Sequence, residues 1–340
     1  MAEKRNNADL EALESNVYIV LLNYNSWEDT NSCIDSLLRM DTQKFRIIVC
    51  DNASTNDSLN KIHKKIWELC KTNGIAYAYY ENDTVSHRLV YVDGSVESGA
   101  KITLIENNEN KGFSAGNNIG IQYALQDGNC QYIWLLNNDT EAHPHALSAL
   151  LDMFHDNENL MMASSICCEF DERERIQCIG GHISHWTFNT EGIGQGVLYR
   201  DVRQVDLRSL SILAGPSVVI RARYFHEAHT YLDERYAFYF EEADLAKNIR
   251  DMGYDIQPCL DSVVYHRGGH STSKKGMSFV AYHLTRSMFL YVIKFYPERV
   301  LFVLIYTIAR AVFSSFKGNF SVAIARMKGM YDALTNQGKK

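Results

Sequence analysis

The first half of the chain alternates apolar segments of strand character with segments of helical periodicity. Strands are expected at Val17–Leu22, Arg46–Cys50, Lys101–Ile105 and Tyr132–Leu136. Helices are expected after the capping-box pattern Ser26–Asp29, from about Asp57 to Cys70, and across Leu147–Phe154. This alternation is typical of βαβ units, so the sequence predicts an α/β fold with a mostly parallel sheet. Beyond Leu160 the pattern changes to shorter strands with glycines between them.

Each of the four predicted strands is followed by polar residues. In chain order these are Asn23-Tyr24-Asn25, Asp51-Asn52-Ala53-Ser54, Asn107 with Lys111-Gly112 through Asn117-Asn118, and Asn137-Asn138-Asp139. Taken singly, such residues commonly serve turns and helix caps. Ligands of open α/β sheets bind beyond the carboxyl ends of the strands, so the repetition over four strands favours one shared ligand site. The first turn contains no glycine, which disfavours a GxGxxG dinucleotide site.

Charge is distributed unevenly along the chain. From Lys274 to Lys340 there are eleven Lys or Arg and two acidic residues, a local charge of +9; since the whole chain carries −7, residues 1–273 carry −16. An acidic body argues against nucleic acid as a partner, whereas a basic, aromatic-rich tail suits the anionic surface of a membrane. The eight cysteines form no CxxC pair, so we expect a reducing cytoplasm rather than a zinc module or a disulfide framework.

The tail from about Phe279 shows two helical patterns that are broken near Pro297. Its longest uninterrupted apolar run, Val300 to Ala309, is shorter than the roughly 20 residues needed to cross a bilayer. We therefore expect the tail to lie on a membrane surface rather than to span it. Packing of these helices on the body, or in a homodimer interface, is an equally weighted alternative, because amphipathic character alone does not separate the two.

Seven segments of the chain together resemble one enzyme family. They are VYIVLLNYNSWEDTNSCIDSLL, IIVCDNASTND, NKGFSAGNNIGI, YIWLLNNDTEAHPHAL, LAGPSVVIRARYF, LDERYAFYFEEADLAKNIRDMGY and VVYHRGGHST. In this order, from about 17 to 272, they resemble glycosyltransferase family 2 and, within it, the rhamnosyltransferase-like members. The resemblance implies a GT-A fold, a Rossmann-like nucleotide-binding mixed sheet flanked by helices.

The resemblance also implies a division of the chain. Residues 1–272 would form the GT-A catalytic domain, with a nucleotide-sugar-binding half at about 17–140 and an acceptor-binding half at about 141–272. The stretch at about 75–100 is Tyr-rich and then polar with no clear period, so we expect an insertion there that forms a hairpin at the sheet edge. Residues 273–340 would form a basic amphipathic helical tail.

On the donor side, the resemblance assigns Asp51 to accept a hydrogen bond from the nucleotide base. The remaining donor-binding candidates are Asn23, Tyr24, Asn25, Lys111, Gly112, Asn117 and Asn138. Asn137-Asn138-Asp139 takes the place of the family's Asp-x-Asp motif, so Asp139 is the expected ligand of Mg²⁺ or Mn²⁺, a hard cation that stabilises a departing diphosphate. Asn137 stands where an acid is common, which leaves Asp139 with more of the charge. His266 is a further candidate metal ligand and His270 a weaker one.

On the acceptor side, Glu241-Glu242 matches the family's Glu-Asp-x-Asp-Leu segment. Position 242 corresponds to the catalytic base, with glutamate in place of the usual aspartate, and Glu241 is the fallback candidate. Acids in the first turn of a helix often only complement its dipole, which is the structural alternative. Leu213-Ala214-Gly215 falls in the family's acceptor-side segment, where a small residue lets the backbone approach a sugar.

The implied activity is an inverting, metal-dependent transfer of a sugar, rhamnose or another hexose, from a dTDP- or UDP-linked donor. The implied acceptor is a hydroxyl of a surface polysaccharide or of a lipid-linked glycan, at the cytoplasmic face of the membrane. A non-catalytic sugar-nucleotide-binding or scaffold protein of the same fold is the alternative, suggested by Asn137 and by glutamate at position 242. An NAD-linked sugar-modifying enzyme is a third hypothesis.

Overall fold

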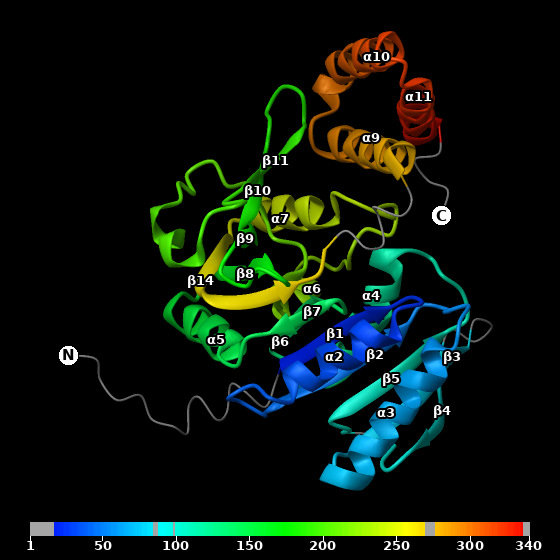
Figure 1. Cartoon of the computed structure of the whole chain (residues 1–340), viewed down its shortest axis with the longest axis vertical. Helices are drawn as coiled ribbons and strands as arrows, with labels where there is room; N and C mark the ends of the chain where they lie inside the picture. The colour runs from blue at the N-terminus through cyan, green and yellow to red at the C-terminus, as the bar shows by residue number, and fades with distance from the viewer. Residues whose placement is uncertain (1–16, 84–87, 98, 269–275, 336–340) are drawn as a thin grey trace.

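The computed structural model describes residues 17–83, 88–97, 99–268 and 276–335. Among these residues, one eleven-stranded sheet runs through the body in the order β4-β3-β5-β2-β1-β6-β13-β8-β14-β7, with β9 paired to β8 (Figure 1). Its strands are β1 (Val17–Asn23), β2 (Phe45–Asp51), β3 (Tyr77–Asp83), β4 (Arg88–Gly94), β5 (Ile102–Asn107), β6 (Tyr132–Asn137), β7 (Thr140–Ala142), β8 (Leu160–Glu169), β9 (Ile176–Cys178), β13 (Ser217–Arg221) and β14 (Asp255–His266). The four strands predicted for the first half are all present.

The sheet is parallel at its centre and mixed further out. β1 pairs in parallel with β2 and with β6, and β2 with β5, whereas β13 runs antiparallel to β6 and to β8. Along β1, Asn23 lies beside Asp51 and Leu22 lies beside Asn137. The polar ends of these strands therefore meet at one edge, as the sequence predicts. β3 and β4 form an antiparallel hairpin at the end of the sheet, as expected for the 75–100 region.

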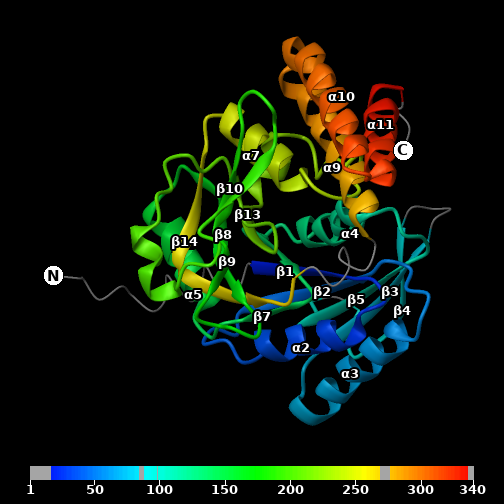
Figure 2. The same ribbon diagram turned by 45° about the horizontal axis from the view of Figure 1, so that its top comes forward.

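Helices cover both faces of the sheet (Figure 2). They are α2 (Trp27–Leu37), α3 (Ser58–Asn73), α4 (Phe113–Leu125), α5 (Ala146–Asp156), α6 (Arg223–Glu227) and α7 (Glu241–Asp251). Alternate residues of β1 face two separate hydrophobic cores. Val17, Ile19 and Leu21 pack with α2, α3 and α5. Tyr18 and Val20 pack with α4, α6 and α7. A strand that is buried on both faces in this way reads as a continuous apolar run, which explains the pattern in the sequence.

A second, small sheet is formed by residues 180–213 and faces the tail. It consists of β11 (Thr190–Ile193), β10 (Gly180–Ile183) and β12 (Ile212–Leu213) in that order, and the short helix η1 (Tyr199–Gln204) follows β11. The expectation of only short strands after Leu160 was wrong for β8 and β14, which are ten and twelve residues long. These two strands extend the main sheet, because they pair with each other in parallel and β8 also pairs with β13.

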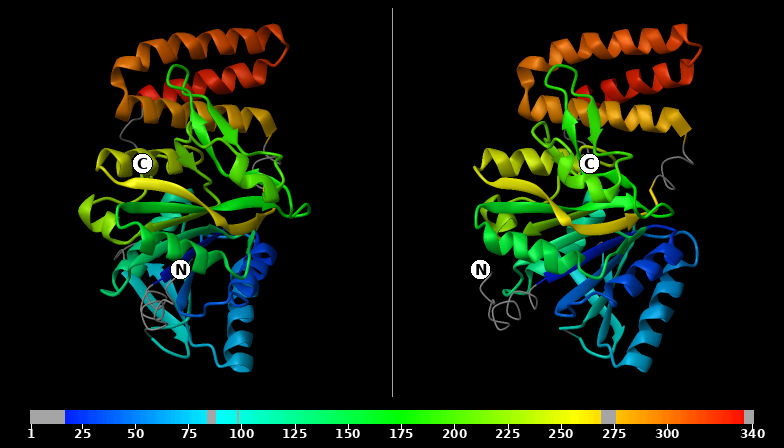
Figure 3. Two further views of the ribbon diagram at one scale, coloured as in Figure 1. Left: turned by 90° about the vertical axis from the view of Figure 1, so that its left-hand side faces the viewer. Right: turned by 60° about the vertical axis from the view of Figure 1, so that its left-hand side comes forward.

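The tail forms three helices, α9 (Gly276–Phe295), α10 (Val300–Phe316) and α11 (Phe320–Thr335), with the single turn η2 (Pro297–Arg299) between the first two. They lie together as a layer at one end of the molecule, next to the β10–β11 hairpin (Figure 3). The sequence predicted two helices; the extra break occurs at Gly318, whose φ of +77° lies in the left-handed region that ends helices.

The prediction that the tail contains no segment long enough to span a membrane was wrong, as judged by the length and composition of one helical segment. Pro297–Phe316 is a 20-residue helical segment with a mean hydropathy of 1.6, and only 17% of that window is buried. Counting only the uninterrupted run missed this segment, because Arg310 ends the run without breaking the helix. A 20-residue helix is about 30 Å long, close to the thickness of a bilayer core.

One local prediction at the start of α2 was also wrong. The helix begins beside Ser26 as expected, but the capping box does not form. Ser26 Oγ donates to the Asp29 carboxylate at 2.6 Å, and not to a backbone N–H. The side chain of Asp29 also forms an ion pair with Arg267 at 3.1 Å.

Candidate functional site

Asp51 lies at the centre of the donor-side strand ends. It is 1% exposed, and its Oδ1 accepts hydrogen bonds from Asn23 Nδ2 at 2.6 Å and from Ser54 Oγ at 2.7 Å. Its Oδ2 accepts from the backbone N–H of Ser54 at 2.9 Å. A carboxylate has about four acceptor positions, so these contacts orient Asp51 and leave capacity for one further donor.

Hydrogen bonds join the turn after β1 to the turn after β2. Asn25, in the left-handed region with φ +58°, accepts a hydrogen bond at Oδ1 from the N–H of Thr55 at 2.8 Å. Ala53 has a similar φ of +57°. Non-glycine residues rarely adopt such angles except where the surroundings enforce them, frequently at functional sites. Tyr24, which precedes Asn25 in this turn, is 44% exposed, whereas Asn23 is fully buried.

The start of α4 forms the neighbouring wall. Gly112 has φ +95°, and a Cβ at this position would lie 3.4 Å from Ala237, so glycine allows the close approach of this turn to the segment before α7. Asn52 Nδ2 donates to the Gly112 carbonyl at 3.2 Å. Asn117 is turned inward and donates to the Phe113 carbonyl at 3.0 Å, while the exposed Lys111 pairs with Glu109 at 2.5 Å. Gly112 and Lys111 thus lie at the surface of the site and Asn117 beneath it.

Asn138, in the polar group that follows β6, forms a hydrogen bond within the protein. Its Nδ2 donates to Thr30 Oγ1 at 2.9 Å, and Thr30 in turn donates to Asn23 Oδ1 at 2.9 Å. Asn138 and Asn23 are therefore linked through a buried threonine. This network orients both side chains below the strand ends, and the expected donor contact of each residue stays a prediction.

Asp139 and His266 form the closest pair of candidate metal ligands. Asp139 Oδ1 lies 3.2 Å from His266 Nε2, and Asn137 Nδ2 lies 3.5 Å from the same ring nitrogen. Both Asp139 and His266 are mostly buried. Within the described ranges no cluster of three or more His, Cys, Asp or Glu side chains suited to a metal ion is present, so the protein offers a pair and not a closed cage. His270 lies outside the described residues.

Gln177 of β9 fixes the orientation of the His266 ring. Gln177 Nε2 donates to Glu169 Oε2 at 3.0 Å and to the His266 carbonyl at 3.3 Å, which turns Oε1 toward the ring. His266 Nδ1 then donates to Gln177 Oε1 at 2.6 Å. The lone pair of neutral His266 is consequently on Nε2, facing Asp139. Gln177 has no signal in the sequence, because β9 is only three residues long and shows no periodicity.

Glu241 and Glu242 begin α7, and both are largely buried. Glu241 Oε2 is buried without a hydrogen-bond partner among the described residues. Burial and the adjacent Glu242 raise the pKa of Glu241 well above its usual range, and burial also raises the pKa of Glu242. The preceding Tyr239 and Phe240 both have positive φ, +67° and +71°, so the backbone entering this helix is strained.

The segment Leu213-Ala214-Gly215 lies between the acidic pair and the strand end that precedes the candidate metal pair. A Cβ built on Gly215 would lie 3.6 Å from Glu242 Oε1, so Glu242 borders the Leu213-Ala214-Gly215 segment. The next residue, Pro216, accepts a hydrogen bond from the Asn137 N–H at 2.9 Å. Gly215 and Pro216 therefore lie between Glu242 and Asn137, the last residue of β6. Both carboxylates are thus at the same edge of the sheet.

The first tail helix braces the segment that carries the acidic pair. Lys294 of α9 contacts both carboxylate oxygens of the buried Asp244, at 2.7 and 2.8 Å. Ser287 Oγ donates to the Phe238 carbonyl at 2.8 Å. Tyr236, Phe240 and Ala243 share a buried core with α9. Packing of the tail on the body was one of the two expectations from the sequence, but no local pattern pairs Lys294 with Asp244.

Known proteins are similar to this chain in sequence and in fold. The chain is similar to the low-salt glycan biosynthesis hexosyltransferase Agl10 of Haloferax volcanii, with 22% identity over 280 residues that cover 80% of this chain and 74% of that protein. Its structure resembles the mannosyltransferase PcManGT of Pyrobaculum calidifontis, solved with GDP-Man and Mn²⁺, with a TM-score of 0.54 and 13% identity over 95% of this chain and 88% of that one. It also resembles GalNAc-T7, solved with UDP, GalNAc and Mn²⁺, with a TM-score of 0.53 and 14% identity over 74% of this chain and 43% of that one.

These likenesses establish the GT-A fold that the sequence predicted. The sequence model described as Glycosyl transferase family 2 matches residues 18–83 and 89–229, more than half of the chain. The helices α9 to α11 lie beyond the matched region. The chain therefore belongs to glycosyl transferase family 2.

Proposed function

We propose that this glycosyltransferase transfers a hexose or a deoxyhexose such as rhamnose, with inversion, from a nucleoside-diphosphate donor to a hydroxyl of a glycan. The observation that carries the proposal is the shared site, in which Glu242 borders Gly215 while Pro216 is bonded to the strand end of Asp139. An inverting transfer needs one carboxylate near the acceptor hydroxyl and positive charge near the leaving diphosphate.

Asp139 and His266 fit a divalent cation such as Mg²⁺ or Mn²⁺. Two acceptor atoms, the carboxylate oxygen and the ring nitrogen that Gln177 leaves unprotonated, face each other at 3.2 Å. Neighbouring ligands of an octahedral ion with bonds of about 2.1 Å are about 3 Å apart, so this spacing suits one ion. Asn137 adds an amide at the same place. When bound, the cation would neutralise charge on the departing diphosphate; two protein ligands leave positions for phosphate oxygens and water.

On the donor side, we assign base recognition to the remaining acceptor position of Asp51. Tyr24 offers an exposed aromatic face next to it, held between the fixed Asn25 and Ala53 turns. UDP- or dTDP-linked donors are the expected class, and the related mannosyltransferase structure contains GDP-Man, so the donor panel must include all three bases.

On the acceptor side, Glu242 takes the proton from the attacking hydroxyl. The acceptor oxygen forms a bond to the anomeric carbon as the bond from that carbon to the phosphate oxygen breaks on the opposite face. Glu242 starts this step ionised, which its position at the N-terminus of α7 favours and its burial opposes. The bound geometry of the two sugars supplies much of the remaining acceleration.

The division into a catalytic domain at 1–272 and a basic helical tail at 273–340 is also proposed. The first tail helix, α9, packs on the body through the Lys294–Asp244 pair and a shared hydrophobic core. We propose that α10 and α11 meet the membrane at its cytoplasmic face. Added salt should weaken a surface interaction of this kind, since anionic lipids attract the basic residues through screened charges.

The test is a donor screen with Mg²⁺ or Mn²⁺ that measures free nucleotide released by the parent chain, by Glu242→Gln and by Asp139→Ala. Release by the parent that both variants reduce at unchanged thermal stability supports the proposal. If none of the three releases more nucleotide than a blank, the chain is a binding or scaffold protein of this fold. Fluorescence titration with NADH checks the dehydrogenase alternative.

A further inference from the structure

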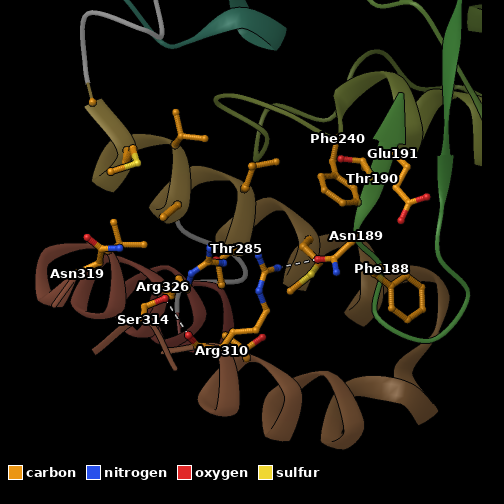
Figure 4. Close-up of a pocket in the computed structure, with 18 residues that line it drawn as sticks. Phe188, Asn189, Thr190, Glu191, Phe240, Thr285, Arg310, Ser314, Asn319 and Arg326 are labelled. Atoms are coloured by element: carbon orange, nitrogen blue, oxygen red, sulfur yellow. Dashed lines mark hydrogen bonds between the residues drawn. The ribbon is translucent and has the colours of Figure 1, made fainter. Parts of the chain in front are cut away.

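A cavity of about 840 Å³ lies among the three tail helices and the β11 side of the small sheet, apart from the strand ends (Figure 4). Much of its wall is apolar, with Met277, Val280, Leu284, Met288 and Val322 among the lining residues. A cavity of this size is in the usual range for small-molecule sites.

Two arginines enter this largely apolar space. Arg310 comes from α10 and Arg326 from α11, and both line the cavity. Arg310 Nη1 donates to Asn189 Oδ1 at 2.7 Å, whereas Arg326 Nε is buried without a hydrogen-bond partner among the described residues. Burial and, after it, the charge of Arg310 lower the pKa of Arg326. Two cations that repel each other in an apolar setting are stabilised by an anion between them.

No protein carboxylate in the described part of the chain supplies that anion. Neither arginine forms an ion pair there, although Glu191 of β11 also borders the cavity. A buried Nε–H without an acceptor is costly, so the presence of Arg326 here points to a ligand with acceptor oxygens. The fork of an arginine matches phosphate oxygens particularly well.

The cavity is adjacent to the acceptor side of the site. Phe240, which lines it, directly precedes Glu241 and Glu242. Phe240 therefore joins the wall of the cavity directly to the segment that carries the proposed base.

The outer surface around the cavity is apolar. α10 and α11 expose Leu301, Ile305, Phe313, Phe316, Phe320 and Ile324, and Phe316 is 86% exposed. At the other end of α10, the exposed Trp186 lies with its ring centroid 6.0 Å from that of Phe302. Contiguous exposed apolar surface marks an interaction site, and an aromatic pair of this kind suits the membrane interface. The apolar surface of α10 and α11 and the two arginines within the cavity are together complementary to an amphiphile with an anionic head group.

We propose that this cavity binds the phosphate or diphosphate group of a long-chain lipid that carries the acceptor, with Arg326 and Arg310 donating to the phosphate oxygens. The lipid chain lies along the exposed faces of α10 and α11. The role of this lipid as acceptor rests on the proposed function, whereas its binding does not.

Binding of the full-length chain to zwitterionic vesicles that contain a small fraction of a long-chain isoprenoid phosphate tests the proposal. Vesicles with phosphatidylglycerol at the same total charge control for surface charge, and inorganic phosphate is added as a competitor. Arg326→Gln should weaken binding to the isoprenoid-phosphate vesicles about tenfold or more, as expected for one lost charge-assisted hydrogen bond. Arg326→Lys, which keeps the charge, should restore part of the affinity.

Lys328→Gln is the matched control variant, because Lys328 lies on the same helix, is exposed and does not line the cavity. It removes the same charge and should change binding less than twofold. Thermal melting of each variant checks folding. Equal losses for Arg326→Gln and Lys328→Gln, equal binding to both vesicle types, or full displacement by inorganic phosphate at micromolar concentration would each overturn the proposal, the last in favour of a free-anion site.

Failure of the lipid site and failure of the proposed function are distinguishable. Vesicle binding needs no donor, and nucleotide release by the parent chain needs no vesicles. Loss of selective lipid binding with nucleotide release intact overturns only the lipid site. Selective lipid binding without any nucleotide release overturns the transferase activity and leaves the lipid site supported.

Discussion

Gln177 Oε1 accepts a hydrogen bond from His266 Nδ1 at 2.6 Å, so the opposite ring nitrogen faces Asp139 at 3.2 Å. Gln177 lies in the three-residue strand β9, and its hydrogen bond sets the tautomer of His266, which is 89 positions further along the chain. Partners of this kind, which orient a ligand without touching the ion, contribute strongly to metal affinity.

Replacing Gln177 by Leu should weaken Mn²⁺ binding about 10- to 100-fold, because the ring of His266 loses both its orientation and its tautomer. The measurement is a titration of Mn²⁺ in the presence of a nucleoside diphosphate, followed by the electron paramagnetic resonance of the free ion. Gln204→Leu, at an exposed glutamine of η1, is the control. Unchanged Mn²⁺ affinity in Gln177→Leu would show that His266 does not hold the ion.

Glu242→Gln should lower kcat about 10²- to 10⁴-fold, the usual contribution of a general base, and leave donor affinity within about twofold. Glu241→Gln should lower kcat by less than about tenfold, because Glu242 and not Glu241 is the carboxylate shown to border Gly215. Steady-state kinetics with donor and acceptor varied separately measures both. The reverse order of the two effects would assign the base to Glu241.

The raised pKa of Glu242 predicts where activity is lost in acid. A base must be ionised, and burial moves its pKa above the ordinary value of 4.5. The acid limb of the profile of kcat/KM against pH should therefore have its midpoint above pH 4.5, at a fixed saturating metal concentration. A midpoint at or below the ordinary value would contradict the assignment.

Glu241→Gln should stabilise the protein at neutral pH. The pKa of Glu241 is raised in the folded state, so the folded chain holds this proton more tightly than the unfolded chain does. The stability that this group contributes is present below the unfolded pKa of about 4.5 and is lost as pH rises through the folded pKa. The Tm of the variant minus that of the parent, measured by calorimetry, should increase from pH 4.5 to pH 8. A difference that stays constant over this range would refute the effect.

The strand ends on the donor side could be predicted from local pattern. Val17–Asn23 and Phe45–Asp51 are buried on both faces and end in polar residues, so their register at Asn23 and Asp51 follows once they pair. The role of each polar residue at these strand ends could not be predicted, because the sequence does not distinguish an asparagine that orients a neighbour from one that contacts a ligand. Asn23, Asn117 and Asn138 prove to bond within the protein.

Contacts between distant segments were predictable only where the family resemblance supplied them. It brought Asp139 and His266 together as candidates, but it contained no information on Gln177 or on Arg326. The tail was misread in two respects for a physical reason. Composition reports its basic charge, whereas tertiary packing decides that Lys294 turns inward to Asp244 and that Thr307 and Arg310 leave α10 intact.

Lys294→Met should destabilise the protein by about 3 kcal/mol, because it leaves the buried Asp244 without its cation. Adding Asp244→Asn in the same chain should recover most of this loss, since the double variant contains neither buried charge. Urea denaturation of the parent, the two single variants and the double variant gives the coupling free energy. Lys328→Met, at an exposed lysine of the same tail, is the control and should change stability by less than about 0.5 kcal/mol. A coupling energy near zero would mean that α9 is held to the acidic segment by its apolar contacts alone, and that the ion pair does not brace Glu242.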